Sequence, residues 1–202
     1  MGGLFPATTM PDRGWWRALW PDPDGTLRAL SITAEMTVLD LCCGDGWFTA
    51  PLARLTGGKV YALDLDPAML AAARAEVATA GATVRGWLAG DARDIAKLLH
   101  KKIDCALIAN TFHGVPDQTG LVRAVARILN PDGRLAVVNW HTRPREETPV
   151  LGRPRGPHTQ VRMTPDQTSA VVEPAGFVFD RVIELPPYHY GALFRLRSSS
   201  AS

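Results

Sequence analysis

The sequence predicts an α/β fold: a Rossmann-like, seven-stranded, mostly parallel sheet with an antiparallel last strand and helices on both faces. Three observations predict it. Short apolar runs recur along the 202-residue chain, and stretches with helical spacing follow them, which is the pattern of strands and helices that alternate around a parallel sheet. The run at 103–109 is almost wholly apolar, as expected of a central strand covered on both faces. The last two strand-like runs lie so close in sequence that they are expected to pair antiparallel.

The elements follow in order from these runs and from the residues that end them. Strands are expected at 37–41, 60–65, 83–88, 103–109, 134–140, 177–185 and 190–196. Helices are expected at 48–55, 67–80, 95–99, 117–129 and 165–174. Pro67 and Pro165 suit the first position of a helix, and Gly57 and Gly81 suit the position after a helix ends. The segment 12–30 is also expected to be helical.

Composition limits the classes of function. The 22 Lys and Arg nearly balance the 20 Asp and Glu, for a net charge of +2, so no strong field would draw the protein onto nucleic acid or an anionic membrane. Cys42, Cys43 and Cys105 form no C-x-x-C pair, so neither a metal site nor a disulfide framework is expected. No basic leader and no run of 18 apolar residues is found. We therefore expect a cytoplasmic protein without a metal, nucleic-acid or membrane partner; the oligomeric state stays open.

Acidic residues and glycines end three successive strands. Asp40 and a turn with Gly44 and Gly46 end the first strand, Asp64 ends the second, and Asp91 follows the third. Glycine lets the backbone approach a ligand closely, and a carboxylate on the second strand can accept hydrogen bonds from both hydroxyls of a ribose. All three segments lie at carboxyl ends of parallel strands, the edge where open α/β sheets bind ligands. The sequence thus predicts a nucleoside site at this edge.

In this order and spacing, the motifs resemble those of the class I S-adenosylmethionine-dependent methyltransferases. The matching residues are those of a D-x-G-x-G-x-G-like first motif, with a cysteine where the first glycine usually falls, and the two later acids: Asp40, Cys42, Gly44, Gly46, Asp64 and Asp91. The resemblance covers 36–140 and, more loosely, the rest of the chain. It implies S-adenosylmethionine as cofactor and S-adenosylhomocysteine as product. Leu65, Met69, Ala92 and Asn110 are further expected neighbours of the cofactor.

The resemblance also implies one methyltransferase domain over 1–202. Its expected parts are a helical cover at 1–35, a cofactor-binding core at 36–140, an acceptor-side loop at 141–163, a helix and antiparallel strands at 164–197, and a tail at 198–202.

Residues after the fourth and fifth strands are candidates for the acceptor side. His113 and His141 stand there, so either could act as a base toward a hydroxyl or thiol; a polar loop residue is the alternative for each. The segment 110–113 lacks the Asn/Asp-Pro-Pro-aromatic motif of family members that methylate exocyclic base or Gln amides. The Pro-Pro-Tyr sequence at 186–188 occurs too late in the chain to supply it.

The 141–163 loop is the candidate acceptor lid. It has four prolines, five arginines and no clear period, and irregular segments of this length are often lids or binding loops. Arginines could clamp an anionic group of the acceptor, although arginine-rich loops are often simply solvated. The predicted acceptor contacts are Trp16, Arg143, Arg153, Tyr188 and Tyr190, with aromatic packing as the alternative for the rings.

The leading hypothesis is methyl transfer from S-adenosylmethionine to a small-molecule acceptor, with an anionic acceptor as one version. A non-catalytic S-adenosylmethionine-binding or sensing protein is the main alternative. Methylation of RNA or protein is disfavoured by the near-neutral charge. An NAD-dependent oxidoreductase is disfavoured because the G-x-G-x-x-G fingerprint requires glycine at position 49, where the chain has Thr49.

Overall fold

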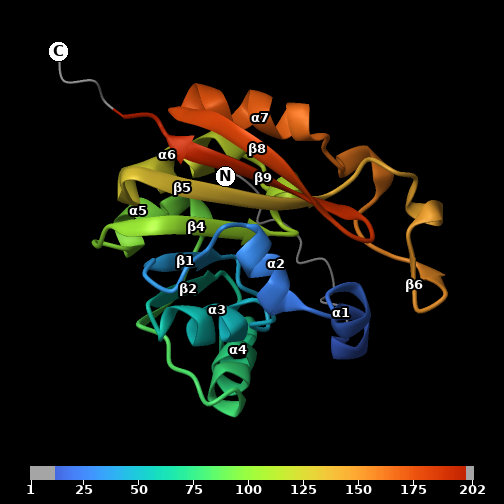
Figure 1. Ribbon diagram of the computed structural model, residues 1–202, viewed down its shortest axis with the longest axis horizontal. Coiled ribbons are helices and arrows are strands. Elements are labelled where there is room, and N and C mark those ends of the chain that lie inside the picture. Colours follow the sequence, from blue (N-terminus) through green and yellow to red (C-terminus); the bar gives the residue numbers. More distant parts are fainter. Residues whose placement is uncertain (1–11, 199–202) are drawn as a thin grey trace.

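The computed structural model describes residues 12–198 and has a single large sheet at its centre (Figure 1). The strands of this sheet are β1 (Val38–Leu41), β2 (Val60–Asp64), β3 (Gly86–Ala89), β4 (Ile103–Ala109), β5 (Leu129–Trp140), β8 (Phe177–Leu185) and β9 (His189–Leu196). Their order is β3-β2-β1-β4-β5-β9-β8. The first five strands pair in parallel, and β9 pairs antiparallel with both β5 and β8. The predicted fold class is confirmed.

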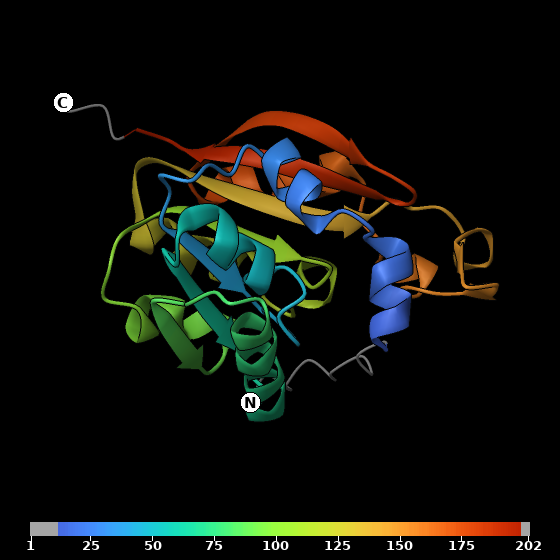
Figure 2. The ribbon, with the colours of Figure 1, turned by 60° about the horizontal axis from the view of Figure 1, so that its bottom comes forward.

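Helices cover both faces of the sheet. They are α1 (Arg13–Leu19), α2 (Pro23–Ala29), α3 (Thr49–Thr56), α4 (Pro67–Thr79), α5 (Ile95–Leu98), α6 (Gln118–Ile128) and α7 (Pro165–Val172). Figure 2 shows α2, α3 and α4 together on the near face, and α5, α6 and α7 pack with one another on the opposite face. None of the helices within 12–198 is long and apolar enough to cross a lipid bilayer.

Alternating side chains of the central strands supply both core layers. Leu39 of β1 and Ala106 of β4 belong to the cluster with α5, α6 and α7. Their neighbours Val38 and Cys105 belong to the cluster with the N-terminal helices. Successive side chains of a strand point to opposite faces, so a strand covered on both faces needs apolar residues at every position. This requirement explains the continuous apolar run in β4.

Several expected elements differ in their bounds from those observed. The fifth strand, for example, begins at Leu129 rather than at 134. The helical segment at 12–30 consists of two short helices, because Pro21 and Pro23 interrupt it and Asp22 caps the second helix by accepting from the Gly25 N–H. The third strand begins at Gly86 rather than at 83. Local periodicity does not determine where pairing with a neighbouring strand begins.

The 141–163 loop is more regular than expected. It contains a small hairpin of β6 (Pro149–Val150) and β7 (Arg153–Pro154). The buried guanidinium of Arg162 fixes the loop, because it donates hydrogen bonds to the carbonyls of Arg143, Arg155 and Pro157 and to Oγ1 of Thr148. The same guanidinium lies 4.9 Å from the ring centre of Trp140 at the end of β5. One side chain thus satisfies carbonyls that have no strand or helix to pair with.

Candidate functional site

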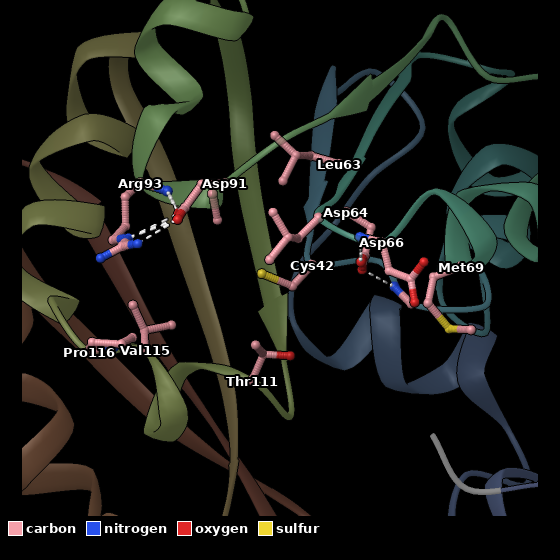
Figure 3. Close-up of a pocket in the computed structure, with 13 residues that line it drawn as sticks. Cys42, Leu63, Asp64, Asp66, Met69, Asp91, Arg93, Thr111, Val115 and Pro116 are labelled. Atoms are coloured by element: carbon pink, nitrogen blue, oxygen red, sulfur yellow. Dashed lines mark hydrogen bonds and ion pairs between the residues drawn. The ribbon is translucent and has the colours of Figure 1, made fainter. Parts of the chain in front are cut away.

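A cavity of about 250 Å³ lies at the carboxyl ends of β1, β2, β3 and β4 (Figure 3). Its wall is mostly apolar and carries a few charged groups. The lining residues are Cys42, Gly44, Leu63, Asp64, Leu65, Asp66, Met69, Asp91, Ala92, Arg93, Thr111, Val115 and Pro116. Seven of the ten predicted cofactor residues are among them: Cys42, Gly44, Asp64, Leu65, Met69, Asp91 and Ala92. Parallel strands bring these segments together because each strand ends at the same edge.

The carboxylate of Asp64 is fixed by two backbone amides. The N–H of Gly44 donates to Oδ2 over 2.8 Å, and the N–H of Asp66 donates to Oδ1 over 3.0 Å. Gly44 has a φ of 55°, a conformation that glycine adopts readily. A carboxylate has about four acceptor positions, so the two that remain can accept from the hydroxyls of a ligand.

Cys42 also stands in the left-handed region, with a φ of 62°. Figure 3 shows its sulfur directed toward the side of the cavity formed by Asp91 and Thr111. Burial is the largest cause that raises the pKa of the Cys42 thiol, and the charge of Asp64 adds to it. The residue therefore presents a neutral thiol to the cavity, not a nucleophilic thiolate.

Arg93 holds the carboxylate of Asp91 on the opposite wall. Its Nε lies 3.0 Å from Oδ1 and 3.1 Å from Oδ2, and its backbone N–H donates to Oδ1 over 2.9 Å. These contacts keep the pKa of Asp91 below its ordinary value, so the carboxylate stays charged. Arg93 was not among the predicted residues, although its position two residues after Asp91 was a usable signal.

Asp40, Gly46 and Asn110 do not line the cavity. Asp40 is buried and accepts a hydrogen bond from Oγ1 of Thr49 over 2.6 Å, and burial raises its pKa to about 7. A Cβ at Gly46 would lie 2.8 Å from the Cα of Ala73, so this glycine is required for α4 to approach the turn. Asn110 has a φ of 61°, and its Oδ1 is buried without a hydrogen-bond partner.

Sequence reasoning also missed the segment that follows β4. Thr111, Val115 and Pro116 line the cavity, whereas the prediction named only Asn110 and His113 in this segment. The 3-10 turn η2 (Phe112–Gly114) folds the segment back over the cavity. The signal was available, because every residue directly after a parallel strand lies at the ligand edge.

His113 lies in η2, which packs against β5. Burial is the largest cause that lowers its pKa, while the neighbouring side chain of Asn139 in β5 raises it. The imidazole is therefore neutral near pH 7, the form that can accept a proton. The other predicted base, His141, lies with Nε2 3.0 Å from Oε2 of the exposed Glu184.

The predicted acceptor-side aromatic residues lie on both faces of the sheet, with Tyr190 in the core on one face and Trp16 and the half-buried Tyr188 on the other. Trp16 is buried and packs against Trp15. Tyr188 stacks on Trp140, with ring centres 5.8 Å apart, and its hydroxyl donates to the carbonyl of Pro149.

Tyr190 is fully buried, and its hydroxyl is engaged by neighbouring side-chain and backbone oxygens. The two predicted arginines differ from these rings, because Arg143 and Arg153 are both exposed. None of the five predicted acceptor contacts is among the cavity-lining residues.

Known proteins resemble this chain in both sequence and fold. A family model described as a methyltransferase domain matches residues 38–133. The 2-phytyl-1,4-naphtoquinone methyltransferase of Synechococcus elongatus is 34% identical over 117 residues, which cover 56% of this chain and 48% of that protein. The ubiquinone biosynthesis O-methyltransferase of Xanthomonas axonopodis pv. citri is 31% identical over 132 residues, 60% of this chain and 54% of that protein. The chain thus spans about half the length of the curated relatives it matches.

A solved structure extends the likeness to nearly the whole chain. The fold of a SAM-dependent methyltransferase from Aquifex aeolicus superposes with a TM-score of 0.75 at 23% identity, and the match covers 92% of this chain and 94% of that one.

The cavity suits the cofactor of this family. Its apolar wall can cover a purine, and the carboxylates of Asp64 and Asp91 on facing walls can accept from a ribose and an exocyclic amine. Within 12–198, no group of three or more His, Cys, Asp or Glu side chains is placed to hold a metal ion. With the matched family model and this strand order, the chain belongs to the class I S-adenosylmethionine-dependent methyltransferases.

Proposed function

We propose that this chain transfers a methyl group from S-adenosylmethionine to a small-molecule acceptor. The observation that carries the proposal is the Asp64 carboxylate, held by the Gly44 amide at the wall of a cavity between strand ends. In this proposal Asp64 accepts from the ribose hydroxyls and Asp91 accepts from the adenine amine. Cys42, Leu65, Met69 and Ala92 cover the nucleoside, and Asp40, Gly46 and Asn110 shape the cavity from outside its wall.

We infer that the acceptor carries a flat ring with a hydroxyl group. Of the two curated relatives described above, one is named for a naphthoquinone and the other as an O-methyltransferase of ubiquinone biosynthesis. Trp16 and Tyr190 are buried, and the half-buried ring of Tyr188, which stacks on Trp140, offers flat apolar surface to such a ring. His113, neutral and in the segment that closes the cavity, would take the hydroxyl proton, and His141 is the second candidate. Arg143 and Arg153 would contact an anionic acceptor only if the exposed loop closed over it.

Calorimetry tests the cofactor half of the proposal. We expect saturable binding of S-adenosylmethionine and S-adenosylhomocysteine and none of NAD, because position 49 is a threonine that leaves the dinucleotide fingerprint incomplete. Saturable NAD binding with no binding of S-adenosylhomocysteine would overturn the proposal.

A labelled-methyl assay tests the acceptor half. The probes are catechol and the reduced form of 2-methyl-1,4-naphthoquinone, with S-adenosylmethionine carrying a labelled methyl group. Transfer to either probe supports a hydroxylated-ring acceptor. Tight binding of S-adenosylmethionine without transfer to any member of a broad acceptor panel would favour the sensing alternative. A cytoplasmic protein of one domain without a nucleic-acid partner remains our expectation.

A further inference from the structure

We propose that Asn139 is a positioning residue that holds the imidazole of His113 in the tautomer able to take a proton from the acceptor. The inference rests on the proposed function for its chemistry, but its test does not require an acceptor. Asn139 is fully buried in β5, and His113 lies in the η2 turn packed against that strand.

Each of the two side chains has one buried atom without a hydrogen-bond partner. These atoms are Oδ1 of Asn139 and Nδ1 of His113. Buried polar atoms are almost always paired, so two unpaired atoms on neighbouring elements call for an explanation. One is an acceptor and the other can carry a hydrogen. Asn139 lies close enough to raise the pKa of His113, and a hydrogen bond between the two atoms would remove both deficits.

The neighbours of Asn139 determine which way its amide points. The hydroxyl of Tyr190 donates its single hydrogen to the carbonyl of Met163 over 2.9 Å. The 2.7 Å contact between Tyr190 and Oγ1 of Thr168 must therefore use the hydrogen of Thr168. Both hydroxyl oxygens then have only lone pairs to offer Asn139, whose Nδ2 lies 3.4 Å from Thr168 and 3.5 Å from Tyr190. The amide nitrogen faces these oxygens, and Oδ1 is left as an acceptor.

This arrangement favours one tautomer of His113. An acceptor beside Nδ1 favours the neutral ring with its hydrogen on Nδ1 and its lone pair on Nε2. Nε2 can then take the proton of an acceptor hydroxyl as the oxygen forms its bond to the methyl carbon. The carbon–sulfur bond breaks with its electron pair going to sulfur, and the imidazolium later releases its proton to solvent. Tyr190 and Thr168 affect His113 indirectly, because they orient the amide of Asn139.

NMR on the full-length chain tests the proposal without any acceptor. In the unsubstituted protein, the ring nitrogens of His113 are expected to show the Nδ1–H tautomer. Asn139→Asp keeps an oxygen at Oδ1 and adds a negative charge, so the tautomer should persist and the pKa of His113 should rise. Asn139→Ala removes the acceptor, so the tautomers should mix and the pKa should fall by about half a unit or more.

Two controls separate positioning from a general structural role. Calorimetric binding of S-adenosylhomocysteine confirms that each variant is folded. If the unsubstituted protein itself did not bind this ligand, the result would count against the proposed function rather than against the role of Asn139. Tyr190→Phe keeps the ring but removes the hydroxyl that orients the amide, so it should weaken the tautomer preference even if Asn139→Ala fails to fold. The proposal would be overturned if folded Asn139→Ala left the tautomer populations and the pKa of His113 unchanged. If the alanine variant does not fold, the same result in Tyr190→Phe would overturn it.

Discussion

The N–H of Gly44 donates to Oδ2 of Asp64 over 2.8 Å, which ties the turn after β1 to the end of β2. The contact joins residues 20 positions apart and places the carboxylate at the cavity wall. The turn and the carboxylate therefore form one structural unit, and a change in either alters the position of the other.

Asp64→Ala is expected to weaken S-adenosylhomocysteine binding by about tenfold or more. The substitution removes the acceptor for the Gly44 and Asp66 amides as well as the proposed acceptor for the ribose, and each lost charge-assisted hydrogen bond contributes roughly 1.5–3 kcal/mol. Calorimetry at constant pH measures the affinity. Asp132→Asn, on an exposed residue outside the cavity, is the matched control. Equal affinities in the two variants would contradict the assignment of Asp64.

Cys42→Met is expected to reduce S-adenosylhomocysteine affinity at least tenfold, with little change in thermal stability. The sulfur of Cys42 faces the cavity, so a longer unbranched side chain would fill space that the ligand needs. Cys42→Ala keeps a Cβ at the same φ of 62° and should bind within about threefold of the unsubstituted chain, because the backbone strain is unchanged. Tight binding by the methionine variant would show that the ligand avoids this side of the cavity.

The sequence predicted those parts of the site that follow directly from strand ends. Asp64 is the last residue of β2, and Cys42 and Asp91 follow closely after β1 and β3. Parallel strands bring such positions together whatever lies between them. The sheet was predictable for a related reason, because a strand covered on both faces is continuously apolar.

The remaining features depend on contacts between distant residues. The sequence near Arg162 does not indicate that its guanidinium donates hydrogen bonds to the carbonyls of residues 143, 155 and 157. Gly46 was assigned to the ligand, although the Cα of Ala73 on α4 is what excludes a side chain there. The role inferred for Asn139 depends on a hydroxyl pair from α7 and β9. The local sequence pattern contains no information on such partners, because tertiary packing determines which distant residues meet.

Asp40→Asn is expected to stabilise the protein at pH 8. Burial raises the folded-state pKa of Asp40 to about 7, whereas an unfolded Asp titrates near 3.9. Between these values the unfolded chain binds fewer protons, so the free energy of unfolding falls as pH rises from about 4 to 7. Asparagine removes this loss, which has an upper limit of about 4 kcal/mol. Urea unfolding at pH 4 and pH 8 measures it, and the variants should converge at pH 4.

Thr49→Val tests the same Asp40 carboxyl by removing its hydrogen-bond donor, and it should make the loss of stability at high pH larger. Its hydroxyl donates to Oδ2 of Asp40 and lowers the pKa of that carboxyl. Without it, the chain should lose more stability at pH 8 than at pH 4. A pH-independent effect would mean that Asp40 stays ionised in the fold.

Arg162→Met is expected to open the 141–163 loop while leaving the sheet intact. Methionine can still pack on Trp140, but the carbonyls of Arg143 and Pro157 lose their donor, and an unpaired buried carbonyl costs about 1–3 kcal/mol. Amide hydrogen exchange should quicken at least tenfold in the loop and remain unchanged in β1 and β4. Arg153→Met, on an exposed side chain, should change neither. Unchanged exchange in the first variant would show that the hairpin, not the guanidinium, holds the loop.

His189 is expected to make the folded protein less stable in acid. Its ring lies 4.4 Å from that of Trp20 and 4.2 Å from that of Trp140, and neither ring nitrogen has a hydrogen-bond partner. Burial is the largest cause that lowers its pKa well below the ordinary value, and the positive charge of Arg162 lowers it further. The folded protein therefore holds this ring neutral where an unfolded histidine, with a pKa near 6.5, takes up a proton.

His189→Phe is accordingly expected to flatten the pH dependence of stability below pH 6.5. Above the unfolded-state pKa, His189 is neutral in both states and does not change the free energy of unfolding. As pH falls from there toward the folded-state pKa, only the unfolded chain takes up the proton, so the free energy of unfolding falls by at most about 1.4 kcal/mol per pH unit. Phenylalanine fits the same aromatic layer and binds no proton. Urea unfolding followed by tryptophan fluorescence at pH 7.5, 6.0 and 5.0 measures the slope, with His100→Gln on an exposed residue as control. A variant that loses stability as steeply as the unsubstituted chain would place the acid sensitivity elsewhere.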